Sequence, residues 1–301
     1  MTEAALRRTS TNTLPRLSLG RVGIYVVLIV GAIASLMPFA YMVMTSLKSY
    51  GAVVDNNFWP WPPFGSEPIQ WSNYSLALQQ IGFDRQTGTP LFVRYLANSV
   101  LVTACIVAGT LITSILAAYA LAKLNLPGKN LLFLLILAII MVPEDATLVP
   151  KVVMMYNLHW YNTYFALIVP FTVNVVAIFL LRQFFLQIPK ELYEAAAIDG
   201  MGHLRFLWSI VVPLSKSAVL TVALLNFIWS WDSFKWPLLV TRDVGMRVLG
   251  VGLQQFKSGE GGTDVHYLMV FATLVVLPVL FFYFLLQKQF REAITTVGIK
   301  G

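Results

Sequence analysis

Two long runs of this chain carry no charged residue, and they constrain its fold more than any other feature. Val22–Leu47 and Tyr95–Ala122 are both longer than the about 20 helical residues that cross the hydrocarbon core of a bilayer. Only 12% of the 301 residues are charged and 57% are hydrophobic, whereas soluble domains contain about 25% charged residues. The sequence therefore predicts an all-α polytopic membrane protein and excludes a soluble enzyme, a disordered chain or a collagen-like rod.

Further apolar runs bring the predicted number of transmembrane helices to six. The third run, Leu131–Pro143, is short and reaches bilayer thickness only if its helix extends from about Lys129 to Pro150. Glu144 and Asp145 then lie near one membrane surface. The fourth, fifth and sixth predicted spans are Thr163–Leu181, Leu214–Val240 and Tyr267–Leu286.

The basic residues predict the orientation, because cytoplasmic segments of membrane proteins are enriched in Lys and Arg. Residues 1–21 form an N-terminal tail that is rich in arginine, so we expect the N-terminus in the cytoplasm. Six spans return the C-terminal tail, residues 288–301, to the same side. The net charge of +7 therefore reflects orientation, and no nucleic-acid partner is expected. Thirteen of the 21 basic residues then lie inside: Arg7, Arg8, Arg16, Arg21, Lys123, Lys129, Arg182, Lys190, Arg205, Lys216, Lys288, Arg291 and Lys300.

Residues 1–301 are predicted to form a single membrane domain with a long external loop at residues 48–94 and a long internal loop at residues 187–213. Cleavage of the first apolar run as a signal sequence is an alternative, since Ala32-Ile33-Ala34 resembles a cleavage site. The run continues to Leu47, however, which exceeds the about 7–15 residues of a signal's apolar region. A transmembrane helix is therefore the favoured interpretation.

The internal loop has the pattern of two short helices. Glu191 and Glu194 suit the N-terminal turn of a helix, where carboxylates interact favourably with the helix dipole. Ala195-Ala196-Ala197 are strong helix formers, and Asp199-Gly200 predicts the end of the helix. An amphipathic segment follows and leads to Pro213. The first helix either docks into a groove of another protein or lies on the lipid surface, and its smooth alanine face favours docking.

This loop resembles the EAA loop of ABC importer permeases. The matching residues are Glu194-Ala195-Ala196, Gly200, Ile210 and Val212-Pro213, with Val212 where the family has Leu. The resemblance covers nearly the whole chain and is greatest for the second permease of maltose-type sugar importers. Two further matching segments are Asn226–Asp232 with Trp236–Thr241, and the ending Thr296–Gly301.

The resemblance implies a type I ABC importer permease fold in the inner membrane. Two permease subunits would form the pore and an ATPase dimer would bind ATP and Mg beneath it, so this chain would hold no cofactor and catalyse no hydrolysis. An external solute-binding (lipo)protein would deliver a sugar, an oligosaccharide or a sugar-like solute such as a glycerol-phosphate compound. The residues implied in contact with the ATPase are Glu191, Glu194, Ala195, Ala196, Ala197, Asp199, Gly200 and Pro213, and in the C-terminal tail Gly298, Lys300 and Gly301.

The solute pathway is predicted from polar and aromatic residues inside the spans. Asn226 lies about 20 Å along a helix from Pro213, and polar groups at such depth are costly and often functional. Asn174, Asn226 and Trp229 are therefore candidates for lining the pathway. The structural alternative is that Asn226 hydrogen-bonds a neighbouring helix and that Trp229 anchors at the membrane interface. Asp232 and Lys235 are spaced for a local ion pair near the outer surface.

Two other functional classes are considered. An ion-coupled secondary transporter would need paired charges within the spans, and an integral-membrane enzyme would need a clustered catalytic set; the sequence indicates neither. The three histidines, His159, His203 and His266, lie on separate segments without the spacing of metal ligands, so no metal site is expected.

Overall fold

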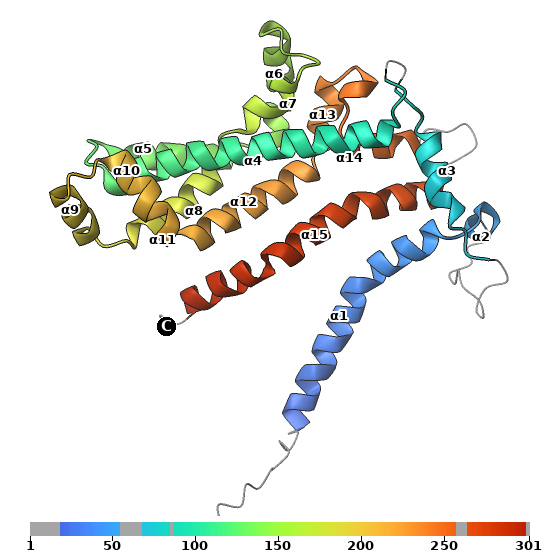
Figure 1. Ribbon diagram of the computed structural model, residues 1–301, viewed down its shortest axis with the longest axis horizontal. Coiled ribbons are helices and arrows are strands. Elements are labelled where there is room, and N and C mark those ends of the chain that lie inside the picture. The colour runs from blue at the N-terminus through green and yellow to red at the C-terminus, as the bar shows by residue number, and fades with distance from the viewer. Residues whose placement is uncertain (1–18, 55–67, 85–86, 257–263, 299–301) are drawn as a thin grey trace, which may run out of the picture.

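The computed structural model describes residues 19–54, 68–84, 87–256 and 264–298, and every named element in these ranges is helical. Figure 1 shows an elongated bundle in which α4 runs along most of the length, with α9 and α10 at one end and α2 and α3 at the other. An isolated bridge joins Phe83 to Pro90. The all-α fold class predicted from the sequence is confirmed.

The long elements alternate with short helical segments. The short 3-10 turns are η1 (Ile139–Met141), η2 (Val169–Phe171), η4 (Val244–Met246) and η5 (Leu253–Phe256), whereas η3 (Leu207–Val211) is a π-helical turn. The α-helices are α1 (Leu19–Ser46), α2 (Tyr50–Val54), α3 (Ser72–Gln80), α4 (Leu91–Lys123), α5 (Lys129–Ala138), α6 (Glu144–Asn157), α7 (Tyr164–Ile168), α8 (Val175–Leu186), α9 (Glu191–Ile198), α10 (His203–Phe206), α11 (Val212–Leu214), α12 (Lys216–Trp231), α13 (Lys235–Val240), α14 (Leu249–Gly252) and α15 (Val265–Gly298).

Among the described residues, four helical segments are long and apolar enough to cross a membrane without a sharp bend. They correspond to the first, second, fourth and sixth predicted spans. Two bent pairs of helices occupy the positions of the third and fifth, so the total is six if each pair counts as one crossing. The four segments are Val22–Ser46, Leu91–Lys123, Tyr164–Leu186 and Val265–Leu285.

The third predicted span is not a single helix from Lys129 to Pro150. The segment Lys129–Met141 meets α6 at an angle of 96°. Pro143 explains this bend: it lacks a backbone N–H and forces the preceding Val142 out of the helical region, to φ −81° and ψ 117°. The predicted continuation through Glu144 and Asp145 is therefore wrong, and these carboxylates instead begin a new helix.

The fifth predicted span, Leu214–Val240, is also divided. α12 ends at Trp231, and α13 begins at Lys235 after a short non-helical break. A continuous helix would lose a hydrogen bond at Pro237, which has no N–H to donate to the carbonyl of Ser233. A second bend of 82° separates the helical segment that ends at Leu214 from α12.

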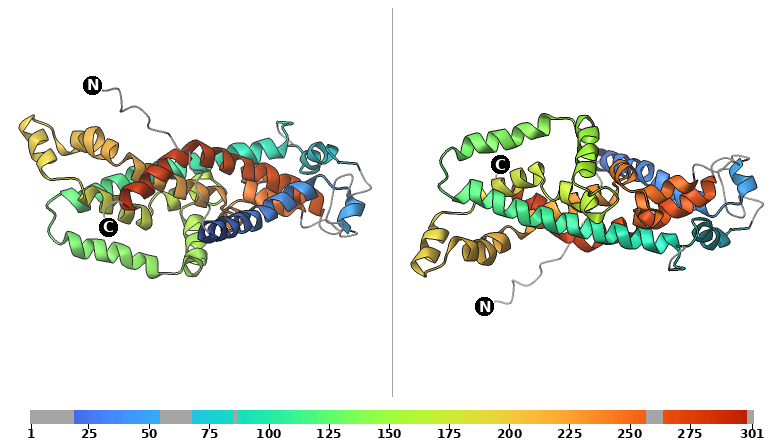
Figure 2. Two further views of the ribbon diagram at one scale, coloured as in Figure 1. Left: turned by 90° about the horizontal axis from the view of Figure 1, so that it is seen from below. Right: turned by 90° about the horizontal axis from the view of Figure 1, so that it is seen from above.

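The core lies along α4, which packs against α8 and α12 (Figures 1 and 2). Gly109 permits a close approach, because a Cβ atom there would lie 2.6 Å from Thr172 Cγ2. Beside it, the hydroxyls of Thr110 and Thr113 donate to the carbonyls of Phe171 and Thr172 at 2.9 and 2.6 Å. These contacts fix the irregular segment between α7 and α8 on the surface of α4.

α1 diverges from the bundle, and only the C-terminal part of α1 contacts α15 (Figure 1). Its side chains from residue 22 to residue 41 are exposed, and almost all of them are apolar. An apolar surface of this extent requires lipid or another protein subunit around it. Such a surface is consistent with the predicted first transmembrane span.

Candidate functional site

The short helix α9 projects from the end of the bundle that is farthest from α3 (Figure 1). It spans Glu191–Ile198, close to the helix predicted from the sequence. Glu191 and Glu194 lie in its first turn and are both exposed. This position stabilises a carboxylate through the helix dipole while leaving it accessible to a partner cation.

Gly200 ends α9 with paired backbone hydrogen bonds. Its φ of +75° lies in the left-handed region that favours glycine. The N–H of Gly200 donates to the carbonyl of Ala197 at 3.0 Å, and the N–H of Met201 donates to the carbonyl of Ala196 at 2.9 Å. This arrangement is a Schellman motif, and it confirms the predicted helix end at Asp199-Gly200.

The alanine triplet divides between two faces of α9. Ala196 is 5% exposed and packs in the apolar cluster that includes Phe185 and Phe206, so it supports the helix from within the chain. Ala195 and Ala197 are exposed, and Ile198 beyond them is 87% exposed. The exposed part of this segment is therefore formed by Ala195, Ala197 and Ile198, whereas Ala196 is already covered by the chain's own core.

His203, the first residue of α10, joins α9 to the bundle. Its Nε2 lies 2.9 Å from the hydroxyl of Tyr193 on α9, and its Nδ1 lies 2.9 Å from the hydroxyl of Tyr119 on α4. The Tyr193 and His203 rings are stacked with centroids 4.5 Å apart, and Phe206 packs edge-on against Tyr193. Sequence reasoning missed this bridge, because Tyr119 is distant from His203 along the chain and no local pattern connects them.

The segment after His203 leads back to the bundle through a π-helical turn. This turn, η3, lies directly before Pro213, which is in the first turn of α11. A residue without an N–H cannot continue the regular ladder of hydrogen bonds, and a wider turn is one way to accommodate it. Leu207 and Val211 of η3 are fully buried, so the turn is held firmly against the core.

The C-terminal tail is described only in part. α15 continues to Gly298, so the first part of the predicted tail at residues 288–301 is helical. Lys300 and Gly301 lie outside the described residues, as do residues 1–18 of the N-terminal tail.

Asn174 and Asn226, two of the predicted pathway residues, hydrogen-bond to each other. Asn174 Nδ2 donates to Asn226 Oδ1 at 3.2 Å, and Asn226 Nδ2 donates to the carbonyl of Val222 at 2.9 Å. Asn174 also caps α8 by accepting from the N–H of Ala177. Asn226 is 6% exposed. The contacts therefore favour the structural alternative for Asn226, which bonds to a residue outside its own helix.

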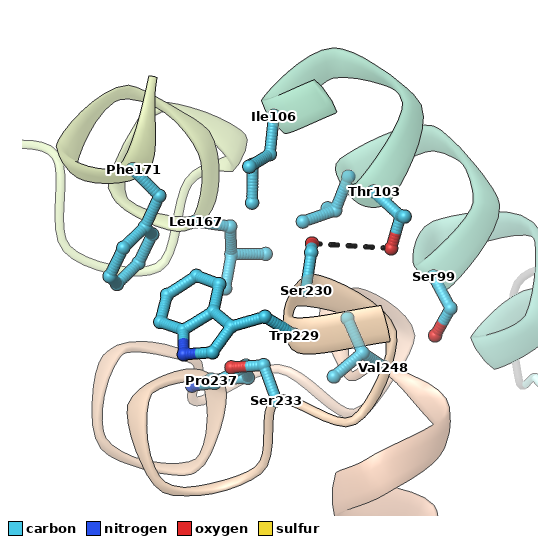
Figure 3. A pocket seen from close by; sticks show the side chains of 11 residues that line it. Ser99, Thr103, Ile106, Leu167, Phe171, Trp229, Ser230, Ser233, Pro237 and Val248 are labelled. Carbon is cyan, nitrogen blue, oxygen red and sulfur yellow. Dashed lines mark hydrogen bonds between the residues drawn. The ribbon is translucent and has the colours of Figure 1, made fainter. Parts of the chain in front are cut away.

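The Trp229 side chain is 42% exposed and lines two separate hollows. On one side it borders a small pocket where Ser230 Oγ donates to Thr103 Oγ1 at 3.3 Å (Figure 3). The Phe171 ring supports it, with the two ring centroids 5.0 Å apart. On the other side is a cavity of about 520 Å³, called the Trp229 cavity below. Its lining residues are Glu144, Asp145, Leu148, Phe171, Leu225, Ile228, Trp229, Asp232, Ser233, Phe234, Lys235 and Trp236.

Two residues that line the Trp229 cavity form an ion pair. Lys235 Nζ of α13 lies 3.1 Å from Asp145 Oδ1 of α6, and both side chains are largely exposed. The predicted local pair between Lys235 and Asp232 is therefore wrong. The bend at Pro143 brings α6 towards α13 and gives Lys235 a partner that is distant in sequence.

Comparison with known proteins agrees with this architecture. Residues 109–296 match the family described as "Binding-protein-dependent transport system inner membrane component". The chain is 35% identical over 224 residues to the sn-glycerol-3-phosphate transport system permease protein UgpE of Yersinia pestis bv. Antiqua (strain Antiqua). The aligned segment covers 74% of this chain and 79% of the relative. Its identity to the protein of the same description from Brucella abortus (strain 2308) is 32% over 273 residues, 90% of this chain and 94% of the relative.

A solved structure shares the fold. It is a chain from the crystal structure of a bacterial ABC transporter involved in the import of the acidic polysaccharide alginate. The TM-score is 0.75 at 26% sequence identity, and the match covers 91% of this chain and 99% of that chain. The resemblance inferred from the EAA-like loop is thus confirmed, and the chain belongs to the family of binding-protein-dependent transport system inner membrane components, as a multi-pass permease subunit of an ABC importer.

Proposed function

We propose that this permease carries a sugar or sugar-like solute into the cell and that α9 couples its movement to ATP hydrolysis by partner ATPase subunits. The observation that carries the coupling role is the exposed end of α9 on a rigidly held base. Glu191, Glu194 and Ile198 are exposed, whereas Ala196 on the opposite face is buried in the chain's own core. The relatives described as sn-glycerol-3-phosphate permeases support a polyol-type solute.

The proposed contact with the ATPase combines charge and apolar burial. Glu191 and Glu194 would each accept charge-assisted hydrogen bonds from basic side chains of the ATPase. Ile198 would enter an apolar hollow, and Ala195 with Ala197 would allow close approach of the two surfaces. Burial of the Ile198 side chain would contribute about 1.5–3 kcal/mol. This contact would let a short helix transmit force without detaching from the ATPase.

The base of α9 supports transmission of this movement to the spans. Tyr119 of α4 bonds to His203, and Ala196 packs in the cluster that holds Phe185 of α8. Closure of the ATPases would move α9 together with the ends of α4 and α8, and access to the pathway would alternate between the two sides of the membrane. In this proposal the α9 end and both termini lie in the cytoplasm, with Gly298–Gly301 directed towards the ATPases.

The proposed complex contains a second homologous permease subunit, an ATPase dimer that binds ATP and Mg, and an external solute-binding protein. This chain would contribute no catalytic residue to ATP hydrolysis. The exposed apolar surface of α1 supports contact with lipid or with the second permease.

The coupling role is tested by reversing one charge on α9. Glu194→Lys should reduce uptake at least tenfold while the protein stays inserted, because a lysine would repel the basic partner expected in the ATPase. The measurements are uptake of radiolabelled solute and permease content in the same membranes. Gln79→Lys is the matched control, since it adds a positive charge at an exposed position of α3 at the other end of the bundle.

Two results would overturn parts of this proposal. Normal uptake by Glu194→Lys would remove α9 from the coupling mechanism. Uptake that persists in ATP-depleted vesicles and collapses with an ionophore would replace the ATP-driven mechanism with ion coupling.

A further inference from the structure

The Trp229 cavity adjoins a small pocket on the charge-free run of α4. Trp229 and Ser233 line both this cavity and the small pocket that is also lined by Thr103 and Ile106 of α4 (Figure 3). At 1.5 Å per residue, Thr103 lies about 13 Å along α4 from Arg94. Thr103 therefore lies within the charge-free run of α4, away from both of its charged ends.

The exposed charged side chains indicate that the cavity faces water. Glu144, Asp145, Asp232 and Lys235 line the cavity and are not buried. Ionisable groups within a membrane are costly unless they face a water-filled cavity or the interior of a bundle. An aqueous space beside Trp229, such as a solute pathway between two permease subunits, accounts for all four residues.

The charges in this cavity are unbalanced. Three carboxylates and one ammonium group line it, and the ammonium of Lys235 is already paired with Asp145 at 3.1 Å. Glu144 and Asp232 make no side-chain hydrogen bond or ion pair with the described residues. Lys151 lies 5.9 Å from the centroid of the Phe171 ring but does not line the cavity. Among the described residues that line it, the cavity thus offers hydrogen-bond acceptors and no unpaired cation.

The aromatic side chains provide a flat surface beside these acceptors. Trp236 is 5% exposed, and its indole N–H donates to the carbonyl of Ala166 at 2.8 Å. Phe171 packs edge-on against Trp236 and also supports Trp229. Trp229 is therefore held in place from behind while its own ring remains exposed. A rigid aromatic face next to oriented polar groups is a common arrangement in small-molecule sites.

We infer that the Trp229 cavity takes an uncharged, polyhydroxylated solute and discriminates against solutes that carry phosphate or carboxylate groups. The apolar C–H face of a sugar ring would stack on Trp229, and its hydroxyls would donate to Glu144 and Asp232. An anion would be repelled by the unpaired carboxylates of Glu144 and Asp232 and would find no unpaired cation among the described lining residues to offset that repulsion. This inference rests on the proposed function and narrows its solute class.

The inference separates this chain from the proteins that it matches. The relatives are described as permeases for sn-glycerol-3-phosphate, and the solved transporter imports an acidic polysaccharide. Both of these solutes are anionic. The solutes named for these relatives therefore belong to the opposite charge class from the one that Glu144 and Asp232 indicate.

The test is direct binding to the transporter complex, purified from its own membrane into nanodiscs without the external binding protein. Saturation-transfer NMR suits weak ligands, and the probes are maltose, glucuronate and sn-glycerol 3-phosphate at equal concentration. We expect saturation of the maltose ring protons and at least a fivefold weaker effect for both anions. Trp229→Ala should reduce the maltose signal at least fivefold, whereas Trp71→Ala, at an exposed tryptophan before α3, should leave it unchanged.

The charge preference is tested separately with Asp232→Lys, which should raise the glucuronate signal relative to maltose at least fivefold. The inference is overturned if either anion binds as well as maltose, if no probe binds, or if Trp229→Ala has no effect. ATP-dependent uptake of sn-glycerol 3-phosphate by the same complex would overturn the inference and leave the proposed permease function intact. Uptake that does not depend on ATP would instead overturn the proposed function.

Discussion

α9 and the Trp229 cavity are assembled from different kinds of contact. α9 is a helix of eight residues, and the backbone bonds that end it all lie between Ala195 and Met201. The Trp229 cavity collects side chains from α6, η2, α12 and α13, which are separated along the chain and meet only because two spans are bent. A local change should therefore affect α9 alone, whereas the cavity should respond to changes in the packing of distant segments.

The largest effect is expected from Gly200→Val at the end of α9. A non-glycine residue at φ +75° costs about 1–2 kcal/mol, and a β-branched side chain is especially unfavourable there. The Schellman motif would open and α9 would lose its orientation, so uptake should fall at least tenfold while binding of maltose is unchanged. Uptake and saturation-transfer NMR measure the two properties.

Gly202→Ala is the matched control for Gly200→Val. Gly202 has φ −76°, and a Cβ atom there would meet no atom within 4 Å. Uptake should therefore be retained. Equal uptake by the two variants would show that the left-handed turn is not needed for coupling.

A smaller effect is expected where α4 supports the cavity. Gly109→Ala would place Cβ 2.6 Å from Thr172 Cγ2 and force the segment carrying Phe171 away from α4. Overpacking of this kind typically costs about 1–3 kcal/mol. The thermal midpoint of the purified complex should fall, and the maltose signal should weaken with it.

Thr172→Ser should partly rescue Gly109→Ala, because it removes the clashing methyl group and keeps the hydroxyl. Gly31→Ala in α1 is the control, since a Cβ atom there meets nothing within 4 Å. If Gly31→Ala and Gly109→Ala lower the thermal midpoint equally, the close approach of α4 to Thr172 is not a support of the cavity.

A more modest change is expected for Tyr119→Phe, which removes one hydrogen bond between α4 and His203. A hydrogen bond of this kind contributes about 0.5–1.5 kcal/mol, so α9 should remain folded but couple less tightly to α4. The number of ATP molecules hydrolysed per solute imported should rise about twofold. Tyr25→Phe on the exposed surface of α1 should leave that ratio unchanged, and an unchanged ratio for Tyr119→Phe would contradict the bridging role.

The smallest effect is expected for the ion pair in the cavity. The side chains of Lys235 and Asp145 retain 71% and 77% of their exposure, and exposed pairs contribute about 0–1 kcal/mol. A double-mutant cycle with Lys235→Met and Asp145→Asn should therefore give a coupling energy of less than about 1 kcal/mol in thermal unfolding. A larger value would mean that the pair is a structural bond between α6 and α13.

The success of the sequence predictions follows the same division between local and distant contacts. The bounds of α9 and its end at Gly200 were predicted well, because alanines, first-turn carboxylates and a terminal glycine act within one or two turns. The prediction of continuous third and fifth spans was wrong, since the length of an apolar run does not reveal a bend at Pro143 or a break after Trp231. The local Asp232–Lys235 pair was wrong for the same reason: sequence spacing did not reveal that α6 lies beside α13.

The sequence by itself determined that this chain is an all-α membrane protein with a short helix in a long loop, because charge-free runs and capping residues act over short distances. The motif in that loop identified the family by its resemblance to the EAA loop of ABC permeases. Only the tertiary structure decided that Ala196 faces inward while Ile198 faces outward, that His203 joins α9 to α4, and that Asp145 pairs with Lys235. These contacts join segments far apart in the chain. Their geometry depends on how whole helices pack and bend, which local periodicity does not specify.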